Sequence, residues 1–485
     1  MNRRVALTRH RACGMLGCGT GRAVSQTKKR AVAAWVLALG AALLVTRGTE
    51  NRSATAAVAG APNVLVIVTD DQRNGTMVAM PKTLQWMAAG GVTFDQGYVT
   101  TPSCCPSRAS IFSGRYVHNH GVLQQGLGSK LDQRSTMQRH LKEGGYFTAM
   151  AGKFLNKWNI GTRPPYFDRY AIAGGGYYNH YWGIDGTVKK IPTYTTTFIG
   201  NKAVEYLSAF KQSNDAKPWF LYLAPFAPHL PRVPETKYAD ATFAPWAKTP
   251  AVNENVSDKP AYLRWRPPVP DSTLQQIRTE QLRTLLSVDD MVDRVMRTLQ
   301  SQGELDNTLV IYLSDNGYPW GEHRLPDDLK FEPYTEMVQV PFFARWPGHL
   351  TAGTHDNRLV ANIDIKPTVL AAAGIAPDPA YPLDGGSFLS AGGRSRAFTE
   401  YFFDDVNSTG VKTWASIRTA TYQYIEDYDQ ASLNGGTFRE YYDLTKDPWM
   451  LTNLYRDGNP ANDPPIAPLS SQVAADRKCA GTTCP

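Results

Sequence analysis

Three short apolar segments constrain the fold of this 485-residue chain more than any other feature. They lie at residues 63–69, 219–224 and 309–314, and each is an almost unbroken run of β-branched, aromatic and leucine side chains. A strand with one wet face would alternate apolar and polar residues, so these segments predict strands that are buried on both faces. Such strands form the parallel centre of a sheet that helices cover on both sides.

Two helical patterns lie between and after these strands. Residues 274–301 and 363–374 place apolar side chains three and four positions apart, and the second segment ends at a glycine. Strands that alternate with helices favour an α/β fold, so we expect a three-layer sandwich with a large, mostly parallel central sheet. Residues 225–270 are rich in Pro and Trp and lack a period, which predicts a long ordered excursion over one face.

A second, smaller unit is expected at the C-terminal end. Pro and Gly cluster at 375–395, which is typical of a domain boundary. Short β-like runs follow at 414–418, 421–426 and 440–443. We therefore expect a main α/β domain over 60–385 and a smaller α+β domain with a short antiparallel sheet over 386–485.

Residues 1–59 have the pattern of an export signal. Three basic residues at 28–30 precede an uncharged apolar run at 31–45, and small residues at 57–59 offer a cleavage site. The run is short for a membrane span, so we expect a secreted protein, with a single cell-surface anchor as the alternative. A pair of arginines, Arg3 and Arg4, leaves open whether export follows the general or the twin-arginine route.

The net charge of +8 belongs to this leader. Residues 1–59 hold ten of the 51 Lys and Arg residues but only one of the 43 acidic residues. The rest of the chain is near neutral, so no overall field favours nucleic acid as a partner. Eleven Trp, 24 Tyr and 18 Phe residues also exclude a disordered chain, because disordered chains lack such apolar area.

Two adjacent cysteines, Cys104 and Cys105, stand where a helix is expected to begin. Pro106 suits the first turn of a helix that runs to about Gly114, so Cys104 is predicted just before the helix and Arg108 one turn into it. Free backbone N–H groups and the helix dipole favour an anion at such a position, and an arginine binds an oxyanion with two hydrogen bonds. The segment indicates a nucleophile at an anion site.

Polar side chains follow each of the three buried strands. Asp70 and Asp71 follow the first, His229 follows the second, and Asp315 and Asn316 follow the third. Ligands of open α/β sheets bind at the carboxyl ends of the strands, so we expect these groups to converge. A cysteine phosphatase is the first hypothesis for such a site, but carboxylates would raise the pKa of a thiol and suit a hard cation.

Taken together, these segments resemble the type I sulfatases, the formylglycine-dependent branch of the alkaline phosphatase superfamily. Residues 104–108 (Cys-Cys-Pro-Ser-Arg) are similar to the family's C-x-P-S-R segment, in which the first Cys is oxidised to formylglycine. The resemblance covers nearly all of the chain after the leader. It includes a first metal strand at 66–72, a second metal loop at 314–317 with 321–323, and a C-terminal signature at 442–448 with 453–454. The Cys pair and residues 118–120, 152–156 and 227–231 are most similar to the N-acetylglucosamine-6-sulfatase branch.

The resemblance implies the cofactors of the site. Cys104 is converted by a formylglycine-generating enzyme, and the aldehyde hydrate offers two hydroxyl groups, one that attacks sulfur and one that allows sulfate to be eliminated. A divalent cation, Ca²⁺ in preference to Mg²⁺, is expected because the implied ligands supply oxygen. These ligands are Asp70, Asp71, Asp315, Asn316 and the modified Cys104.

The resemblance also implies roles for the remaining site residues. Arg108 orients the hydrate, Lys153 and Lys330 neutralise sulfate oxygens, and His229 protonates the leaving alcohol. Leu155 stands where many sulfatases have a histidine. We therefore expect Asn156, the next residue, to donate a hydrogen bond to the substrate instead.

A secreted hydrolase of sulfate esters is the leading hypothesis, with sulfated sugars such as N-acetylglucosamine 6-sulfate as substrates and aryl sulfates as further candidates. One alternative is a phosphonate monoester or phosphodiester hydrolase, which shares the metal site and the modified cysteine. Another is a non-catalytic, Ca²⁺-stabilised glycan-binding protein in which Cys104 stays a thiol.

Cys479 and Cys484 can close a small disulfide loop in an exported protein. Three histidines, His118, His120 and His323, are expected to be structural or rim residues.

Overall fold

The structure is a computed structural model that describes residues 60–213, 217–327, 329–404, 410–429 and 432–485. The predicted leader, residues 1–59, lies outside the described residues. Within the described part, no helix has both the length and the apolar character that crossing a membrane requires.

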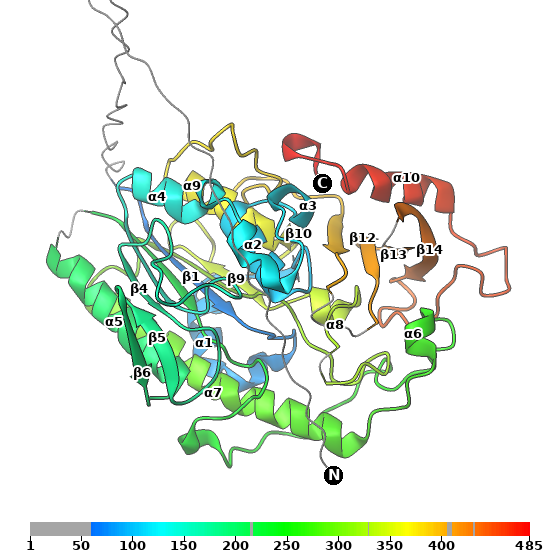
Figure 1. The fold of residues 1–485 in the computed structure, drawn as a ribbon, viewed down its shortest axis with the longest axis horizontal. Coiled ribbons are helices and arrows are strands. Elements are labelled where there is room, and N and C mark those ends of the chain that lie inside the picture. Colours follow the sequence, from blue (N-terminus) through cyan, green and yellow to red (C-terminus); the bar gives the residue numbers. More distant parts are fainter. Residues whose placement is uncertain (1–59, 214–216, 328, 405–409, 430–431) are drawn as a thin grey trace, which may run out of the picture. The chain divides into compact units, whose positions relative to one another are not determined.

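A ten-stranded mixed sheet forms the centre of the molecule (Figure 1). The three apolar segments found in the sequence supply β1, β7 and β8, which are parallel neighbours and buried along their whole length. Antiparallel strands occur towards both sides of this parallel centre. The order is β10 (Thr354–Ala361), β2 (Val92–Tyr98), β9 (Phe342–Arg345), β8 (Thr308–Ser314), β1 (Asn63–Thr69), β7 (Trp219–Ala224), β3 (Phe147–Gly152), β4 (Arg169–Ile172), β5 (His180–Ile184) and β6 (Thr187–Ile191).

Helices cover both faces of this sheet, as the buried strands require. On β1, Val64 and Val66 contribute to the core beneath α2 (Cys104–Ser113), α4 (Met137–Glu143) and α9 (Ile365–Ala372). The alternating residues Leu65 and Ile67 contribute to the core beneath α1 (Pro81–Met87), α5 (Thr195–Ser213) and α7 (Asp271–Ser301). Each fully buried Val, Leu or Ile side chain contributes about 1.5–3 kcal/mol to stability. The predicted three-layer α/β sandwich is confirmed.

The two helices predicted from periodicity are present with small shifts at their ends. Helix α7 begins at Asp271, directly after a proline, three residues before the periodic pattern becomes clear. Helix α9 starts at Ile365 because residues 362–364 form a 3₁₀ turn first. Four-residue helices complete the fold at α3 (Val117–His120), α6 (Ala261–Arg264) and α8 (Thr335–Val338).

A four-stranded antiparallel sheet forms the C-terminal part, in the order β11 (Ala397–Tyr401), β12 (Thr413–Arg418), β13 (Tyr422–Asp429) and β14 (Ser432–Asp443). One face packs on α10 (Ile466–Asp476), and the other packs on residues 325 and 329–338 of the main body. The three β-like runs of the sequence are thus confirmed as β12, β13 and β14. A boundary near residue 385 stays a prediction.

The first half of the excursion over 225–270 lies along α7. Arg278 and Arg283 of that helix donate hydrogen bonds to the carbonyl oxygens of Ala244 (3.2 Å) and Ala241 (2.9 Å). At the other end of the chain, Cys479 and Cys484 form the disulfide that the sequence allows.

Candidate active site

The site lies at the carboxyl ends of four adjacent parallel strands, β8, β1, β7 and β3. In that order, the strands are followed by Asp315 and Asn316, by Asp70 and Asp71, by His229, and by Lys153. The main chain ties two of these segments together, because the backbone N–H of Asp71 donates to Oδ1 of Asp315 at 3.2 Å. The convergence expected from the strand ends is therefore present.

Two glycines allow the backbone to pack closely at this edge. A Cβ atom on Gly152 would overlap the carbonyl oxygen of Ala224, and one on Gly317 would overlap the carbonyl oxygen of Glu336. Gly152 also has a φ of +115°, which L side chains rarely adopt. Because these glycines adjoin a lysine and an amide of the site, their backbone contacts fix where both functional segments leave the sheet.

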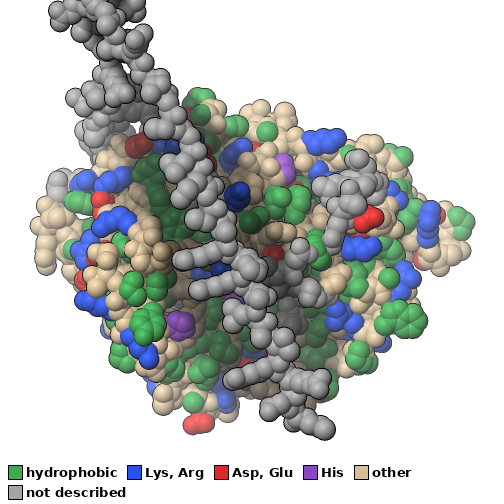
Figure 2. All heavy atoms as spheres, in the orientation of Figure 1, with side chains coloured by type: hydrophobic (Ala, Val, Ile, Leu, Met, Phe, Trp, Pro, Cys, Tyr) green, Lys and Arg blue, Asp and Glu red, His purple; other side chains and the backbone are tan. Residues whose placement is uncertain are grey.

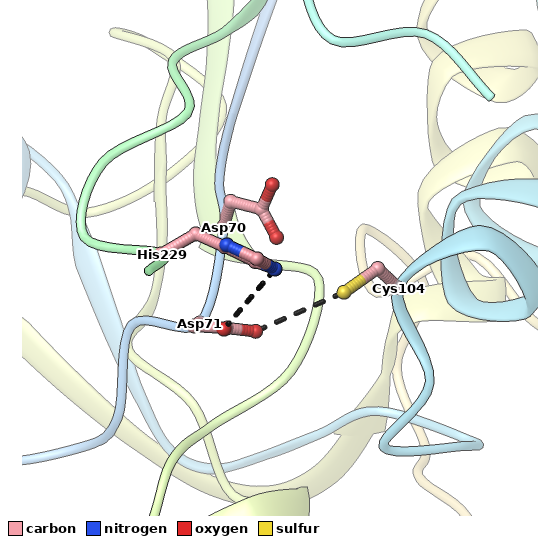
Figure 3. Close-up of side chains that lie close together, drawn as sticks. All are labelled: Asp70, Asp71, Cys104 and His229. Carbon is pink, nitrogen blue, oxygen red and sulfur yellow. Dashed lines mark hydrogen bonds and ion pairs between the residues drawn. The ribbon is translucent and has the colours of Figure 1, made fainter. Parts of the chain in front are cut away.

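Helix α2 brings Cys104 and Arg108 to the same place. The helix starts at Cys104 itself, one residue earlier than predicted, with Pro106 at its third position. A proline is tolerated there because the first N–H groups of a helix have no intrahelical acceptor. The side chain of Cys104 is buried, and its Sγ lies 3.8 Å from Oδ1 of Asp71 (Figure 3).

Three carboxylates are paired with three cations in this site, and all six side chains are buried. The pairs are Asp70 with Lys153 (2.5 Å), Asp71 with Lys330, and Asp315 with Arg108 (2.8 Å). Nζ of Lys330 also lies 3.0 Å from Sγ of Cys104. Because the formal charges cancel, a bound divalent cation would leave excess positive charge that an anionic substrate balances.

These surroundings keep a thiol at position 104 protonated. Burial raises the pKa of Cys104, and the positive charges of Lys153 and Lys330 offset this effect only in part. Burial also raises the pKa of Asp315 to about 6, although the charge of Arg108 opposes it. A thiolate nucleophile needs a lowered pKa, so the burial of Cys104 disfavours the cysteine phosphatase hypothesis.

His229 faces the carboxylates through Nε2. Its Nδ1–H donates to the carbonyl oxygen of Leu230 at 2.8 Å, which leaves Nε2 at 3.7 Å from Oδ2 of Asp71 (Figure 3). Burial lowers the pKa of His229, and the charges of Asp71 and Asp70 raise it by less. Nε2 is therefore the nitrogen available for proton transfer at the site.

Asn156 lies at the rim of the site and is held by a residue that the sequence did not single out. Its amide group donates to Oε1 of Gln125 at 2.7 Å, and the same oxygen accepts the backbone N–H of Cys105. Oδ1 of Asn156 is buried and has no hydrogen-bond partner within the described chain. The amide N–H that the sequence suggested as a donor to the substrate is thus used by Gln125 in this structure.

The segment that carries Lys330 is held by the small C-terminal sheet and by α6. Trp414 of β12 is buried, and its Nε1–H donates to the carbonyl oxygen of Phe331 at 2.7 Å. Three further hydrogen bonds join Gln423 to the carbonyl of Pro333 (2.6 Å), Tyr262 to Glu332 (2.7 Å), and Tyr334 to Glu440 (3.0 Å). Side chains far from the reacting centre thus fix the backbone on both sides of residue 332.

The carboxylate and amide oxygens of the site fit a hard divalent cation. Asp70, Asp71, Cys104 and His229 each place one ligand atom within 4.8 Å of the others. Oδ1 of Asp70 and Oδ1 of Asn316 are buried oxygens without a hydrogen-bond partner among the described residues. Such oxygens are costly to bury unless something binds them, and carboxylate and amide oxygens are the ligands of Ca²⁺ and Mg²⁺.

His118, His120 and His323 make contacts of a structural kind. His118 bonds to Glu400, His120 bonds to Ser110, and His323 bonds to Glu254 and stacks on Tyr334.

A cationic and carboxylate-lined site at the strand ends of a three-layer α/β sandwich is typical of hydrolases that act on anionic esters, and four of its residues could hold a metal ion. The family model named sulfatase matches residues 62–375, and a second, N-sulphoglucosamine sulphohydrolase C-terminal, matches residues 321–477. The chain belongs to the sulfatase family and is a sulfatase.

Individual relatives agree with this assignment. The N-acetylglucosamine-6-sulfatase of Capra hircus is 31% identical over 87% of this chain and 84% of its own length. A solved structure of a protein in complex with its substrate D-glucosamine-2-N,6-O-disulfate has a TM-score of 0.72 at 22% identity, covering 85% of this chain and 96% of that one. The structure of the phosphonate monoester hydrolase of Agrobacterium radiobacter has a TM-score of 0.69 at 22% identity, and the match covers 86% of this chain and 96% of that one. These two structural likenesses show the fold.

Proposed function

We propose that this sulfatase hydrolyses sulfate esters of sugars of the N-acetylglucosamine 6-sulfate type, using a formylglycine at position 104 and a bound Ca²⁺ ion. The observation that carries the proposal is the position of Cys104, which starts a buried helix beside three carboxylates and three cations. Relatives named N-acetylglucosamine-6-sulfatase, about 31% identical over most of the chain, support the substrate class.

Each group has a role that its position supports. Asp70, Asp71, Asp315 and Asn316 would hold the cation, which when bound polarises a sulfate oxygen and favours loss of a proton from the nucleophile. A formylglycine hydrate supplies two hydroxyl groups on one carbon, one to attack sulfur and one to release sulfate. The remaining residues of this site are Arg108, Lys153, His229 and Lys330.

The two lysines and the histidine act on the substrate. Lys330, 3.0 Å from Sγ of Cys104, and Lys153 stabilise negative charge that develops on the sulfate oxygens. His229 acts through Nε2, because its Nδ1–H donates to the carbonyl oxygen of Leu230; Nε2 protonates the leaving alcohol oxygen once the ring has taken up a second proton. Arg108, fixed by Asp315, orients the nucleophile.

We also propose that the protein is exported and folds as a main domain over 60–385 and a smaller one over 386–485. The leader pattern of residues 1–59 and the disulfide between Cys479 and Cys484 support export, because disulfides persist in oxidising compartments. Maturation then requires a formylglycine-generating enzyme in the host.

Parallel turnover assays test the function. Protein from a host with the modifying enzyme is given N-acetylglucosamine 6-sulfate, an aryl sulfate and a phenyl phosphonate monoester, with Cys104→Ala as the matched control. We expect the largest kcat/KM for the sugar sulfate and none in the control. A larger value for the phosphonate would establish the phosphonate hydrolase alternative, and no turnover at all would support a glycan-binding protein.

A further inference from the structure

A cleft of about 410 Å³ opens next to Lys153 and His229. A sulfate group alone is far smaller than this, whereas a cleft of a few hundred Å³ suits a ligand with one or two rings. Its wall is built by residues 153–158, which follow β3, and by Phe226, which follows β7. The cleft therefore has room for the body of a sugar substrate next to two of the proposed site residues, Lys153 and His229.

The cleft carries positive charge without a carboxylate to balance it. Among the described residues that line it there are two lysines and a histidine, and neither Asp nor Glu. Lys153 is committed to Asp70 at the base of the cleft, 2.5 Å away. Lys157, at the rim, is exposed and makes no hydrogen bond or ion pair with any described residue.

The backbone at Lys157 is in the left-handed region, with φ at +61°. This conformation is uncommon for a residue other than glycine, and it costs about 1 kcal/mol. Both neighbours are fixed: Asn156 by Gln125, and Trp158 by a hydrogen bond from its Nε1–H to the carbonyl of Thr162 at 3.0 Å. The segment around Lys157 therefore holds a defined backbone conformation at the rim of the cleft.

The neighbouring side chains suit a sugar. Trp158 contacts Phe154 edge to face with ring centroids 4.9 Å apart, so its ring is a rigid apolar wall. Asn156 also lines the cleft, and its Oδ1 is a buried acceptor without a hydrogen-bond partner among the described residues. The ammonium group of Lys157 lies next to Trp158 and Asn156. It can form an ion pair, which an uncharged sugar would not use.

We propose that Lys157 binds a second anionic group of the substrate, a carboxylate or sulfate that is not cleaved, so that the preferred substrates are sugars with at least two negative charges. The inference rests on the proposed function and narrows its substrate class. On the face drawn in Figure 2, Lys and Arg side chains are spread among apolar and polar atoms rather than gathered in one basic field.

Three substrates separate the sources of the second charge. N-acetylglucosamine 6-sulfate has one negative charge, glucosamine 2-N,6-O-disulfate adds a sulfate, and a disaccharide of N-acetylglucosamine 6-sulfate with a uronic acid adds a carboxylate. The variants are Lys157→Asn, which removes the charge but keeps a residue that tolerates left-handed backbone, and Lys157→Arg, which keeps the charge. Lys189→Asn, at an exposed lysine of β6 outside the cleft, is the matched control.

For one or both doubly charged substrates, we expect Lys157→Asn to raise KM about fivefold more than for the singly charged sugar, the size of an ion pair at a protein surface. Lys157→Arg should restore most of the difference, Lys189→Asn should show none, and added salt should reduce it. Equal effects of Lys157→Asn on all three substrates would overturn the inference while leaving the sulfatase activity in place. If wild-type protein releases sulfate from none of them, the proposed function fails, and the inference fails with it.

Discussion

Replacing Trp414 with Phe tests whether the C-terminal sheet positions Lys330. The substitution removes the donor of a 2.7 Å hydrogen bond and leaves the carbonyl oxygen of Phe331 buried without a partner. An unsatisfied buried group costs about 1–3 kcal/mol, and the smaller ring adds about 1 kcal/mol for lost packing. We therefore expect the free energy of unfolding to fall by about 2–4 kcal/mol.

The effect on turnover follows from the position of this hydrogen bond in the chain, directly next to a residue of the site. Phe331 is the residue next to Lys330, and a displacement of about 1 Å in a catalytic group can cost on the order of 100-fold in rate. We expect kcat for a sulfate ester to fall at least tenfold in Trp414→Phe at a temperature where both proteins are fully folded. Chemical unfolding and initial rates measured on the same preparations give both quantities.

Trp449→Phe is the matched control, because this tryptophan follows β14 in the same region and is 39% exposed. Stability and kcat should both stay near their wild-type values in the control. A folded Trp414→Phe protein with a kcat within twofold of wild type would refute the positioning role of the sheet, whatever the loss of stability.

Three further results are expected. Cys104→Ala should abolish sulfate release with an unchanged unfolding transition, whereas Cys105→Ala should keep most activity; equal loss in both would contradict the assignment of the nucleophile. Dialysis against a strong chelator should stop turnover and Ca²⁺ should restore it, while full activity in metal-free protein would remove the cation from the mechanism. Burial raises the pKa of Glu332 to about 8 in the folded protein, from the usual value of 4.5. Between these two pH values, the folded state keeps a proton on Glu332 that the unfolded state has lost. Stability should therefore fall from pH 5 to pH 8, by at most about 1.4 kcal/mol per pH unit for this one proton, and Glu332→Gln should flatten that slope in chemical unfolding curves; an equal slope in both proteins would contradict it.

The parallel centre of the sheet was predictable because its strands are buried on both faces. An apolar, β-branched run such as 63–69 has few other stable environments, and its polar successors Asp70 and Asp71 mark the edge where ligands bind. The hairpin of β5 and β6 was not predicted, since residues 187–191 are mostly exposed and do not alternate apolar with polar side chains.

Within the site, local patterns located the acids but not their partners. Lys153 and Lys330 are single lysines without a distinctive neighbourhood, and only the family resemblance pointed to them. Gln125 and Trp414 gave no signal, because their importance comes from hydrogen bonds to residues 20 and 83 positions away. Long-range contacts of this kind leave no periodicity in the sequence.

The mass of the peptide that contains residue 104, taken from enzyme shown to release sulfate, tests the central claim most directly. An aldehyde in place of the thiol lowers the mass by the difference between the groups CH₂SH and CHO, and an aldehyde-reactive hydrazide should label this peptide alone. We expect the converted form to rise in proportion to specific activity across preparations. Full turnover by protein in which every copy of the peptide keeps its thiol would contradict the account.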